Sequence, residues 1–353
     1  MAKTLYGFYV SFSGELSPPI NNVYALSPNG EIVSKAVLGS GGYQELRGMA
    51  FGPDGNLYVA QAYKKASLIL QFSGAPDKSG TRKLLGSFVT PAASSGLSHP
   101  YQLVFNADGD LFVTSQDTNV VTAFSPDGKP KANSKFLQKK YPTGKFNPGT
   151  FVAAFSAKPG APAFTPVPVE AGGMTFKDDS LAAKAPPPKG TAREGAEKSG
   201  ATHSARGLAF DKDGNLYVAD EGANRVAVFD DGGKLIGEIK GSKSHELMAP
   251  VALCFVKKAG PSGTLYIGSP GNRSLFAYDV SKKDFQAKAF VWNAPELEKL
   301  SGIAVDPSGN ILTGERKTNA IHKWTPNGEP SPFAGPFSDC PEQIIAVTTP
   351  IVG

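Results

Sequence analysis

The residues that could do chemistry recur at two places in a repeated segment. The start set lies where a short apolar run begins: Arg47, Tyr101, Arg206, Val251, Ser301 and Glu342. The end set lies four residues after the next apolar run begins: Gln61, Ser115, Asp220, Ser269 and Glu315. We expect Arg47, Tyr101, Arg206 and Glu342 of the start set and Gln61, Ser115 and Ser269 of the end set to bind the substrate. Two arginines in the start set favour an anion such as a carboxylate, which guanidinium groups hold through paired hydrogen bonds. The two acids of the end set could act as a general acid or base, with the Asp220 carboxylate holding its own loop as the alternative.

Histidines indicate a second candidate site. His99, His203 and His245 each lie shortly before one of the first apolar runs. Three neutral imidazoles can bind Zn²⁺ and leave a position for water or substrate, and His99 could also take part in acid–base chemistry. Their offsets from the runs differ, however, so solvated loop histidines are the alternative interpretation.

The repeated segment itself predicts a β-hairpin. Two copies read RGMAFGPDGNLYVA (Arg47–Ala60) and RGLAFDKDGNLYVA (Arg206–Ala219), and three further copies vary this pattern. Each joins two apolar strands through an Asp-Gly or Ser-Gly turn, where glycine supplies the positive φ that such turns need. A third strand then ends in an aromatic residue thirteen positions after the second strand starts, at Phe124, Phe229, Tyr278 and Trp324. With a weaker fourth strand, each unit is typical of a propeller blade.

The two ends of the chain together predict a sixth blade. Pro341–Val347 (PEQIIAV) is typical of a first strand, and the N-terminal segment is typical of second, third and fourth strands. Pairing these ends would close the ring and remove an exposed sheet edge. We therefore expect an all-β, six-bladed propeller in which residues 1–353 form a single domain.

One interval between repeats is much longer than the others. From Gln102 to Gly207 the chain runs 105 residues, against 41 to 54 elsewhere. The excess, at about 133–203, carries nine of the 29 prolines and predicts an insertion. A degenerate seventh blade is the alternative, because Gly149–Phe155 (GTFVAAF) reads as a strand.

Composition excludes several classes of protein. Lysine and arginine exceed aspartate and glutamate by 36 to 31, but residues 128–203 alone hold twelve basic and five acidic residues. The basic excess therefore belongs to the insertion, and we expect no nucleic-acid partner. No apolar stretch is long enough to span a membrane. We expect a cytoplasmic monomer, with a mature secreted domain as the alternative.

Two segments carry a resemblance to known families. DGNLYVADEGANRVAVFD (Asp213–Asp230) resembles an NHL repeat, and TGERKTNAIHKWTPNG (Thr313–Gly328) resembles the repeats of streptogramin B lyases, with Glu315 in the position of that family's strand-ending glutamate. The resemblance implies a six-bladed propeller. Such propellers include protein- and RNA-binding modules, streptogramin lyases, the peptide-amidating lyase, gluconolactonases and the strictosidine-synthase group, so the resemblance is specific for fold and not for function.

Two functions follow as hypotheses. The first is a small-molecule lyase or lactonase-like hydrolase at the mouth of the central channel, acting on an anionic substrate with or without a divalent metal (zinc or calcium). The Glu-x-Pro and Asn-Gly strand beginnings of the gluconolactonase calcium site have no counterpart in this start set. The second is a non-catalytic module that binds a ligand or a protein.

Overall fold

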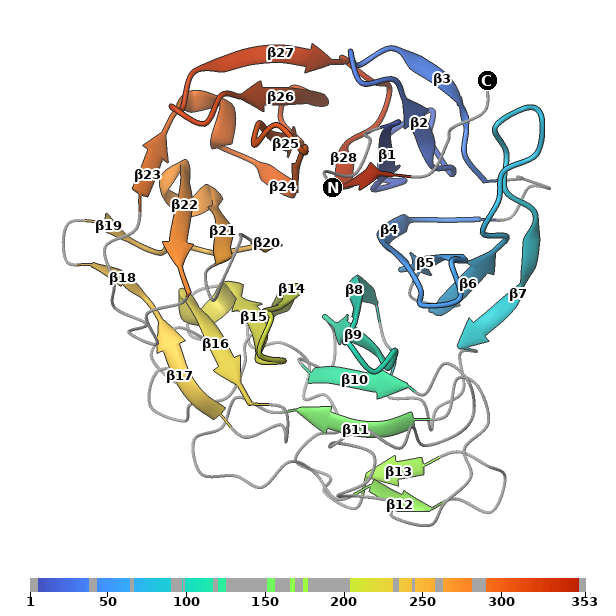
Figure 1. The fold of residues 1–353 in the computed structure, drawn as a ribbon, viewed down its shortest axis with the longest axis horizontal. Coiled ribbons are helices and arrows are strands. Elements are labelled where there is room, and N and C mark those ends of the chain that lie inside the picture. The colour runs from blue at the N-terminus through green and yellow to red at the C-terminus, as the bar shows by residue number, and fades with distance from the viewer. Residues whose placement is uncertain are drawn as a thin grey trace.

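The computed structural model describes residues 6–37, 43–63, 67–89, 97, 99–116, 120–124, 151–155, 166–168, 174–176, 204–230, 235–242, 245–257, 263–280 and 290–348. Six four-stranded antiparallel sheets stand in a ring around a central axis, each with its first strand nearest the axis (Figure 1). The described residues contain no α-helix. The prediction of an all-β, six-bladed propeller is confirmed.

Within each blade the four strands follow one another outward from the axis, with the first strand innermost. The closing blade consists of β28 (Pro341–Val347), β1 (Gly7–Phe12), β2 (Tyr24–Leu26) and β3 (Ile32–Lys35). Blade 1 consists of β4 (Leu46–Phe51), β5 (Leu57–Gln61), β6 (Leu68–Phe72) and β7 (Leu84–Val89). Blade 2 consists of β8 (Pro100–Phe105), β9 (Leu111–Ser115), β10 (Val120–Phe124) and β11 (Phe151–Phe155).

The other half of the ring follows the same plan. Blade 3 consists of β14 (Ala205–Phe210), β15 (Leu216–Asp220), β16 (Arg225–Phe229) and β17 (Leu235–Ile239). Blade 4 consists of β20 (Ala252–Lys257), β21 (Gly263–Ser269), β22 (Ser274–Asp279) and β23 (Phe290–Asn293). Blade 5 consists of β24 (Leu300–Val305), β25 (Ile311–Glu315), β26 (Ala320–Trp324) and β27 (Pro330–Ala334).

Smaller elements lie outside the blades. Two short hairpins pair β12 (Pro166–Pro168) with β13 (Met174–Phe176) and β18 (Gly241–Ser242) with β19 (His245–Glu246). Three 3₁₀ turns are η2 (Glu221–Ala223), η3 (Pro270–Asn272) and η4 (Pro295–Leu297). Among the described residues, no helix is long and apolar enough to cross a membrane.

The predicted turns form the inner hairpins. Between β14 and β15, Gly214 has a φ of +83°, which glycine adopts without steric cost. The carboxylate of Asp211 accepts the backbone N–H groups of Asp213 and Asn215 at 2.8 and 2.9 Å. An Asx turn of this kind reverses the chain within the few residues between the strands.

Aromatic pairs join neighbouring blades. Tyr58 of β5 meets Phe105 of β8 edge-on, with ring centroids 5.0 Å apart, and Phe112 of β9 meets Phe210 of β14 at 4.9 Å. In both interfaces the second residue of a second strand contacts the last residue of the next blade's first strand. This shared contact explains why the repeat has an aromatic or large apolar residue at both positions.

The ring closes through the two ends of the chain. Strand β28 pairs antiparallel with β1, and the register aligns Gly7 with Val347 and Tyr9 with Ile345. The pairing that the sequence predicts for the sixth blade is confirmed. Immediately before β28, the buried carboxylate of Asp339 accepts hydrogen bonds from the loop that follows β1: Ser13 Oγ, Gly14 N and Ile20 N, each at 2.9 Å.

Strand β11 lies within the predicted insertion. It pairs antiparallel with β10 and aligns Val121 with Phe155, so GTFVAAF contributes the fourth strand of blade 2. The long interval therefore begins inside this blade, after its third strand. Most of the remaining residues of 133–203 lie outside the described residues, and the single-domain prediction stays a prediction.

We expect Asp339→Ala to weaken ring closure. The substitution leaves the Gly14 and Ile20 N–H groups without their acceptor, which should lower the free energy of unfolding by on the order of 3 kcal/mol in denaturant titrations. Glu31→Ala, at an exposed position of the closing blade, is the matched control and should change it by less than about 0.5 kcal/mol. Equal stability of the two variants would contradict this account of the closure.

Two deletions test the role of β11. Removing residues 157–200 should leave a cooperatively unfolding propeller, because all six sheets stay complete. Removing residues 133–200 also removes β11 and exposes the edge of β10, so the melting temperature should fall by on the order of 5 °C or the protein should associate. Indistinguishable melting curves for the two deletions would show that β11 is dispensable.

Candidate functional site

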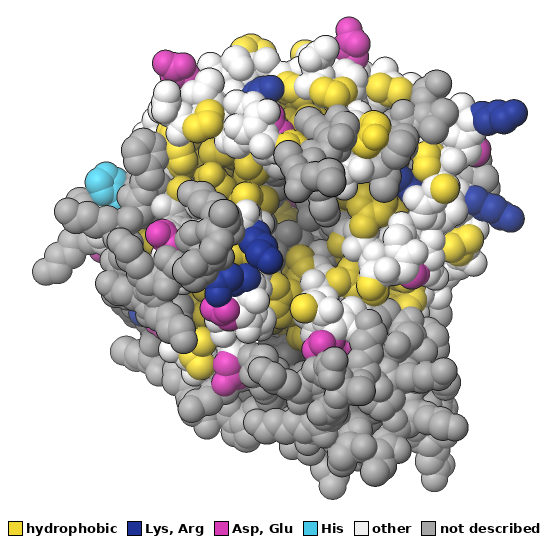
Figure 2. Space-filling model, in the orientation of Figure 1, with side chains coloured by type: hydrophobic (Ala, Val, Ile, Leu, Met, Phe, Trp, Pro, Cys, Tyr) yellow, Lys and Arg dark blue, Asp and Glu magenta, His cyan; other side chains and the backbone are white. Residues whose placement is uncertain are grey.

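A pocket opens where the first strands converge on the axis. Its free volume is about 10 Å³, room for about one water molecule. Figure 2 shows one face of the ring, hollowed near its centre, with Lys or Arg side chains close to the hollow. Four members of the start set line the pocket: Arg47, Tyr101, Ser301 and Glu342.

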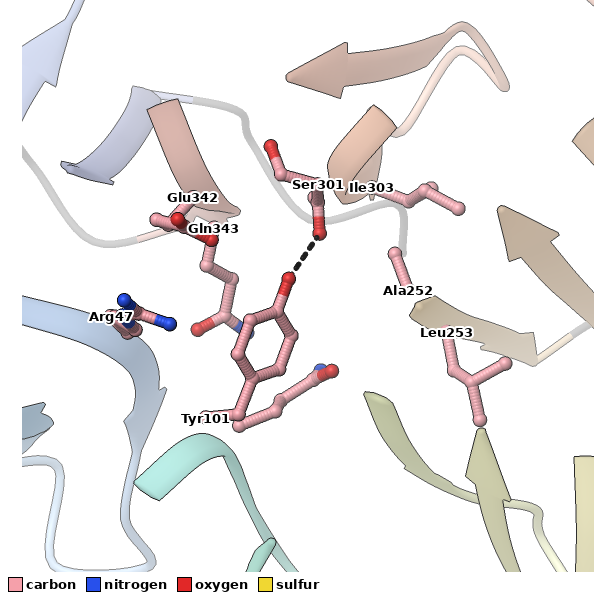
Figure 3. Close-up of a pocket in the computed structure, with 10 residues that line it drawn as sticks. Arg47, Tyr101, Ala252, Leu253, Ser301, Ile303, Glu342 and Gln343 are labelled. Carbon is pink, nitrogen blue, oxygen red and sulfur yellow. Dashed lines mark hydrogen bonds between the residues drawn. The ribbon is translucent and has the colours of Figure 1, made fainter. Parts of the chain in front are cut away.

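The pocket has a polar side and an apolar side. Arg47 and Glu342 lie on one side of Tyr101, and Ala252 and Leu253 lie on the other (Figure 3). Arg206 does not line the pocket, because its guanidinium lies over the Tyr101 ring, 4.9 Å from the centroid. An anion site shared by Arg47 and Arg206 stays a prediction.

Tyr101 spans the pocket. Its hydroxyl donates to the backbone oxygen of Ser301 on the far side, at a long distance of 3.3 Å (Figure 3). Burial raises the pKa of Tyr101 above its usual value, and the negative charge of Glu342 raises it further, while the neighbouring arginines oppose the shift. The phenol therefore keeps its proton at neutral pH and can donate a hydrogen bond.

A chain of charges runs along the polar side. Arg47 Nη2 lies 2.8 Å from Glu15 Oε1, and Arg316 Nη2 lies 2.7 Å from Glu15 Oε2. Arg316 Nη1 in turn lies 3.5 Å from Glu342 Oε1, within ion-pair distance but without a hydrogen bond. Glu45 approaches Arg47 at 3.7 Å. Two guanidinium groups thus face three carboxylates.

Glu342 stands out in this chain because its carboxylate is buried without a hydrogen bond. The residue is 2% exposed, and no described residue donates a hydrogen bond to either of its oxygens. A buried carboxylate without donors is costly, so a group that enters the pocket and donates to Glu342 gains from satisfying it. The Nε of Arg47 is likewise buried without an acceptor among the described residues.

Two glutamines next to the start set join neighbouring first strands. Gln343 Oε1 accepts the backbone N–H of Met49 in blade 1, and Gln102 Oε1 accepts that of Leu208 in blade 3 at 3.1 Å. In both cases the strand whose N–H donates carries a glycine next to its start-set arginine, Gly48 in β4 and Gly207 in β14. At Gly48, an added Cβ would lie 2.6 Å from the next blade's backbone, so only glycine fits there.

Hydroxyl groups repeat the same connection. Ser11 Oγ donates to the backbone oxygen of Arg47, and Thr114 Oγ1 donates to that of Arg206 at 2.7 Å. Each hydroxyl also accepts the backbone N–H of the glutamine in its own blade, at 3.1 Å for Gln343 and 3.0 Å for Gln102. The same four-residue arrangement therefore positions both start-set arginines.

The end set has a different role from the predicted one. Both oxygens of Glu315 are occupied: Oε1 accepts Lys299 N at 2.7 Å, and Oε2 accepts the N–H and hydroxyl of Thr318. Asp220 is fully buried and accepts Arg225 Nε at 3.1 Å. Neither carboxylate lines the pocket. We therefore no longer assign catalysis to Glu315 or Asp220, and the loop-holding alternative accounts for their contacts.

The three neutral end-set residues are buried in the same manner. Ser269 Oγ accepts Met248 N at 2.7 Å and donates to Met248 O at 2.9 Å. Gln61 Oε1 accepts Gln44 N at 3.3 Å, and Ser115 is fully buried. None of the three lines the pocket, so their predicted part in substrate binding is not supported by their positions.

The polar residues that reach the start set come one position later. Arg316 contacts Glu342, and both Gln116 and Glu221 bind the guanidinium of Arg206. Side chains alternate across a strand, so a shift of one residue past the strand end changes the side on which the side chain lies. Applying this alternation to the repeat would have favoured the later position.

The structure separates the histidines. His99 is buried, and its Nε2 lies 3.8 Å from Glu45 Oε2 near the polar side of the pocket. His245 is exposed on β19, and His203 lies outside the described residues. The described residues contain no group of three His, Cys, Asp or Glu side chains that could hold a metal. The zinc site with all three histidines stays a prediction.

Comparisons with known proteins support the fold. Residues 202–229 match the family model of the NHL repeat, and this range includes the inner hairpin (β14 and β15) and the third strand (β16) of blade 3. No curated protein matches the chain. The likeness that the sequence shows in this repeat is therefore confirmed by one blade and by the six-bladed ring.

Solved structures match almost the whole length. A chain of a nidogen–laminin complex is 12% identical, with 97% of this chain and 98% of that chain covered and a TM-score of 0.57. A protein of unknown function from Desulfotomaculum acetoxidans is 10% identical, with the same coverage and a TM-score of 0.55. Virginiamycin B lyase from Staphylococcus aureus is 12% identical over 84% and 73%, with a TM-score of 0.48. At these identities the likeness concerns the fold alone.

We expect Gln343→Ala and Gln102→Ala to destabilise the ring. Each removes the acceptor of a backbone N–H on the next blade's first strand, which should cost about 1–3 kcal/mol in the free energy of unfolding. Gln71→Ala, whose amide lies on β6 away from the axis, is the control and should cost less. If the Gln71 variant is as unstable as the other two, the glutamine bonds near the axis have no special role.

Proposed function

We propose that this protein is a small-molecule lyase or hydrolase whose active site is the central pocket, with Glu342 as the general base. The observation that carries the proposal is the Glu342 carboxylate, which is buried in the pocket and receives no hydrogen bond from any residue that the structure describes. Both Glu342 oxygens can therefore accept a hydrogen bond from a group that enters the pocket, whereas both oxygens of Glu315 already accept hydrogen bonds within the protein.

Tyr101 is the pocket residue placed to act as the matching general acid, and because its pKa is raised it would transfer its proton only to a strongly basic leaving group such as an alkoxide. It keeps its proton at neutral pH, faces the pocket, and makes only a long hydrogen bond to Ser301 O, so its hydroxyl can turn toward a ligand. Because Tyr101 spans the pocket, the ring must shift when a substrate enters.

The two residues support either reaction class. In a lyase reaction, Glu342 takes a proton from a carbon; the C–H electron pair forms a double bond as the leaving group departs, and Tyr101 protonates that group. In a hydrolase reaction, Glu342 takes a proton from water, the oxygen attacks an acyl carbon, and Tyr101 protonates the oxygen that leaves. Arg316, 3.5 Å from Glu342, compensates part of the negative charge of the carboxylate before the proton moves.

The pocket is nearly filled in the free protein. Its free volume is about 10 Å³, room for about one water molecule, so a substrate enters only when the Tyr101 ring shifts, and we expect a small molecule rather than a polymer. The apolar side with Ala252, Leu253 and Ile303 would contact the body of such a molecule, while its polar group faces Glu342. A cytoplasmic monomer without a nucleic-acid partner remains our expectation.

A non-catalytic binding module is the second candidate. The observation in its favour is Tyr101, which occupies the pocket and ties β8 to blade 5 through Ser301 O. A propeller of the same fold is also found in a nidogen–laminin complex, where it is part of a protein assembly. In this case the outer face of the ring, and not the pocket, would carry the function.

Glu342→Gln tests the catalytic proposal. The amide has nearly the same shape but cannot accept a proton, so kcat on a substrate found by screening lactones, esters and β-substituted carboxylates should fall by about 10²–10⁴-fold. Tyr101→Phe should also lower kcat, because it removes the acid while keeping the ring. Glu31→Gln, at an exposed position, is the matched control.

The outcomes separate the two candidates. A loss of kcat in the Glu342 variant with unchanged melting temperature supports the enzyme. Full activity of Glu342→Gln overturns the assigned base. Absence of turnover on every substrate of the screen, in a folded protein, overturns the enzyme and leaves the binding module.

A further inference from the structure

Glu15 makes an unusual contact at the mouth of the pocket. Its two carboxylate oxygens bind two different arginines, with Oε1 2.8 Å from Arg47 Nη2 and Oε2 2.7 Å from Arg316 Nη2. Arg47 lies on β4 of blade 1 and Arg316 follows β25 of blade 5, so the two arginines flank the closing blade. We call Arg47 and Arg316 the arginine pair.

The partners differ strongly in burial. The side chain of Arg47 is 4% exposed and that of Arg316 is 32% exposed, whereas that of Glu15 is 48% exposed. The backbone beside Glu15 is held in place, because Gly14 N donates to Asp339 and Glu15 N donates to Ser13 Oγ. The Glu15 side chain can therefore turn into solvent while its loop and the arginine pair stay where they are.

We propose that the arginine pair is the binding site for a carboxylate group of the substrate, and that Glu15 occupies this site in the free protein. The inference rests on the proposed function and names its substrate class: a small molecule that carries a carboxylate. Guanidinium groups bind carboxylates through paired charge-assisted hydrogen bonds, and the contact with Glu15 is an example of that recognition in the same place.

Charge favours an anion over other replacements. When Glu15 turns away, Arg47 still faces Glu45 at 3.7 Å and Arg316 faces Glu342 at 3.5 Å, but the short bonds of both arginines are lost. A ligand carboxylate restores these two bonds and leaves the net charge of the cluster unchanged. An amine would meet two cations, and a neutral amide would offer weaker acceptors.

Arg47 can make more hydrogen bonds to a ligand carboxylate than it makes to the Glu15 side chain. Its Nε is buried and has no acceptor among the described residues, while Glu15 uses only Nη2. The Nε–Nη2 edge of a guanidinium binds a carboxylate with two parallel hydrogen bonds. A ligand carboxylate is not tethered to the chain, so it can bind both nitrogens of this edge. The Glu15 side chain binds only Nη2.

The arginine pair would also place the substrate against the proposed base. Arg316 contacts Glu15 through Nη2 and Glu342 through Nη1, so the carboxylate site and the base are joined by one guanidinium. Arg47 and Glu342 lie on the same side of Tyr101 in Figure 3. Atoms next to a bound carboxylate would therefore lie close to Glu342.

Binding of butyrate tests the inference without any need for turnover. Titrations followed by NMR of the arginine Nε–H resonances compare the wild-type protein with Glu15→Ala, Arg316→Gln and the matched control Glu31→Ala. Removing Glu15 empties the site, so we expect butyrate to bind about tenfold more tightly or better, while Arg316→Gln should weaken it about tenfold, the effect of losing one charge-assisted hydrogen bond. Butanamide, which is neutral and of the same size, should bind measurably to none of the four proteins.

The results decide the inference independently of catalysis. Affinity for butyrate that is unchanged in Glu15→Ala and in Arg316→Gln overturns the carboxylate site, as does equal binding of butanamide. Absence of butyrate binding to folded Glu15→Ala also overturns it. Tight butyrate binding to Glu15→Ala, together with an active Glu342→Gln variant, would retain the carboxylate site and reject Glu342 as the base.

Discussion

The pairing of β28 with β1 is the interaction on which the rest of the structure depends. A ring of blades has no exposed inner edge only when the two ends of the chain complete one sheet, and here the last strand supplies the innermost position of the closing blade. The same strand carries Glu342 and Gln343 into the pocket. Closure of the ring and assembly of the candidate site are therefore one event, and Asp339 stabilises both by binding the loop after β1.

The backbone polar groups of the first strands explain why the pocket is polar. Neighbouring first strands diverge too much to pair as a sheet, so their inward N–H and C=O groups need side-chain partners. Gln343 and Gln102 supply acceptors, and Ser11 and Thr114 supply donors. In blades 4 and 5 the positions equivalent to these glutamines hold Ala252 and Gly302, and the pocket is apolar there.

The electrostatics of the mouth follow from pairing arginines with glutamates. Arg206 binds Glu221 and Gln116, and Arg47 binds Glu15. Both guanidinium groups are therefore already paired with side chains of the protein, which the residue types alone do not reveal. Glu342 alone combines deep burial with oxygens that receive no hydrogen bond from the described residues. The group most available for chemistry is thus a carboxylate, with the Arg316 guanidinium at ion-pair distance from it.

The sequence by itself determined the blades, because hairpins are local: an Asp-Gly turn and the alternation around it are complete within fifteen or so residues. It also located the start set, since the first residue of each inner strand follows from the repeat, and four of its six members line the pocket. Only the tertiary structure decided which of these side chains are available to a ligand and which are occupied by contacts within the protein. Tyr101 meets Ser301 across 200 positions of the chain, and Met49 meets Gln343 across 294, so no local pattern records these contacts. The end set lies away from the pocket because one step along a pleated strand changes the side on which a side chain lies, and a repeat aligned by spacing alone does not distinguish the two sides.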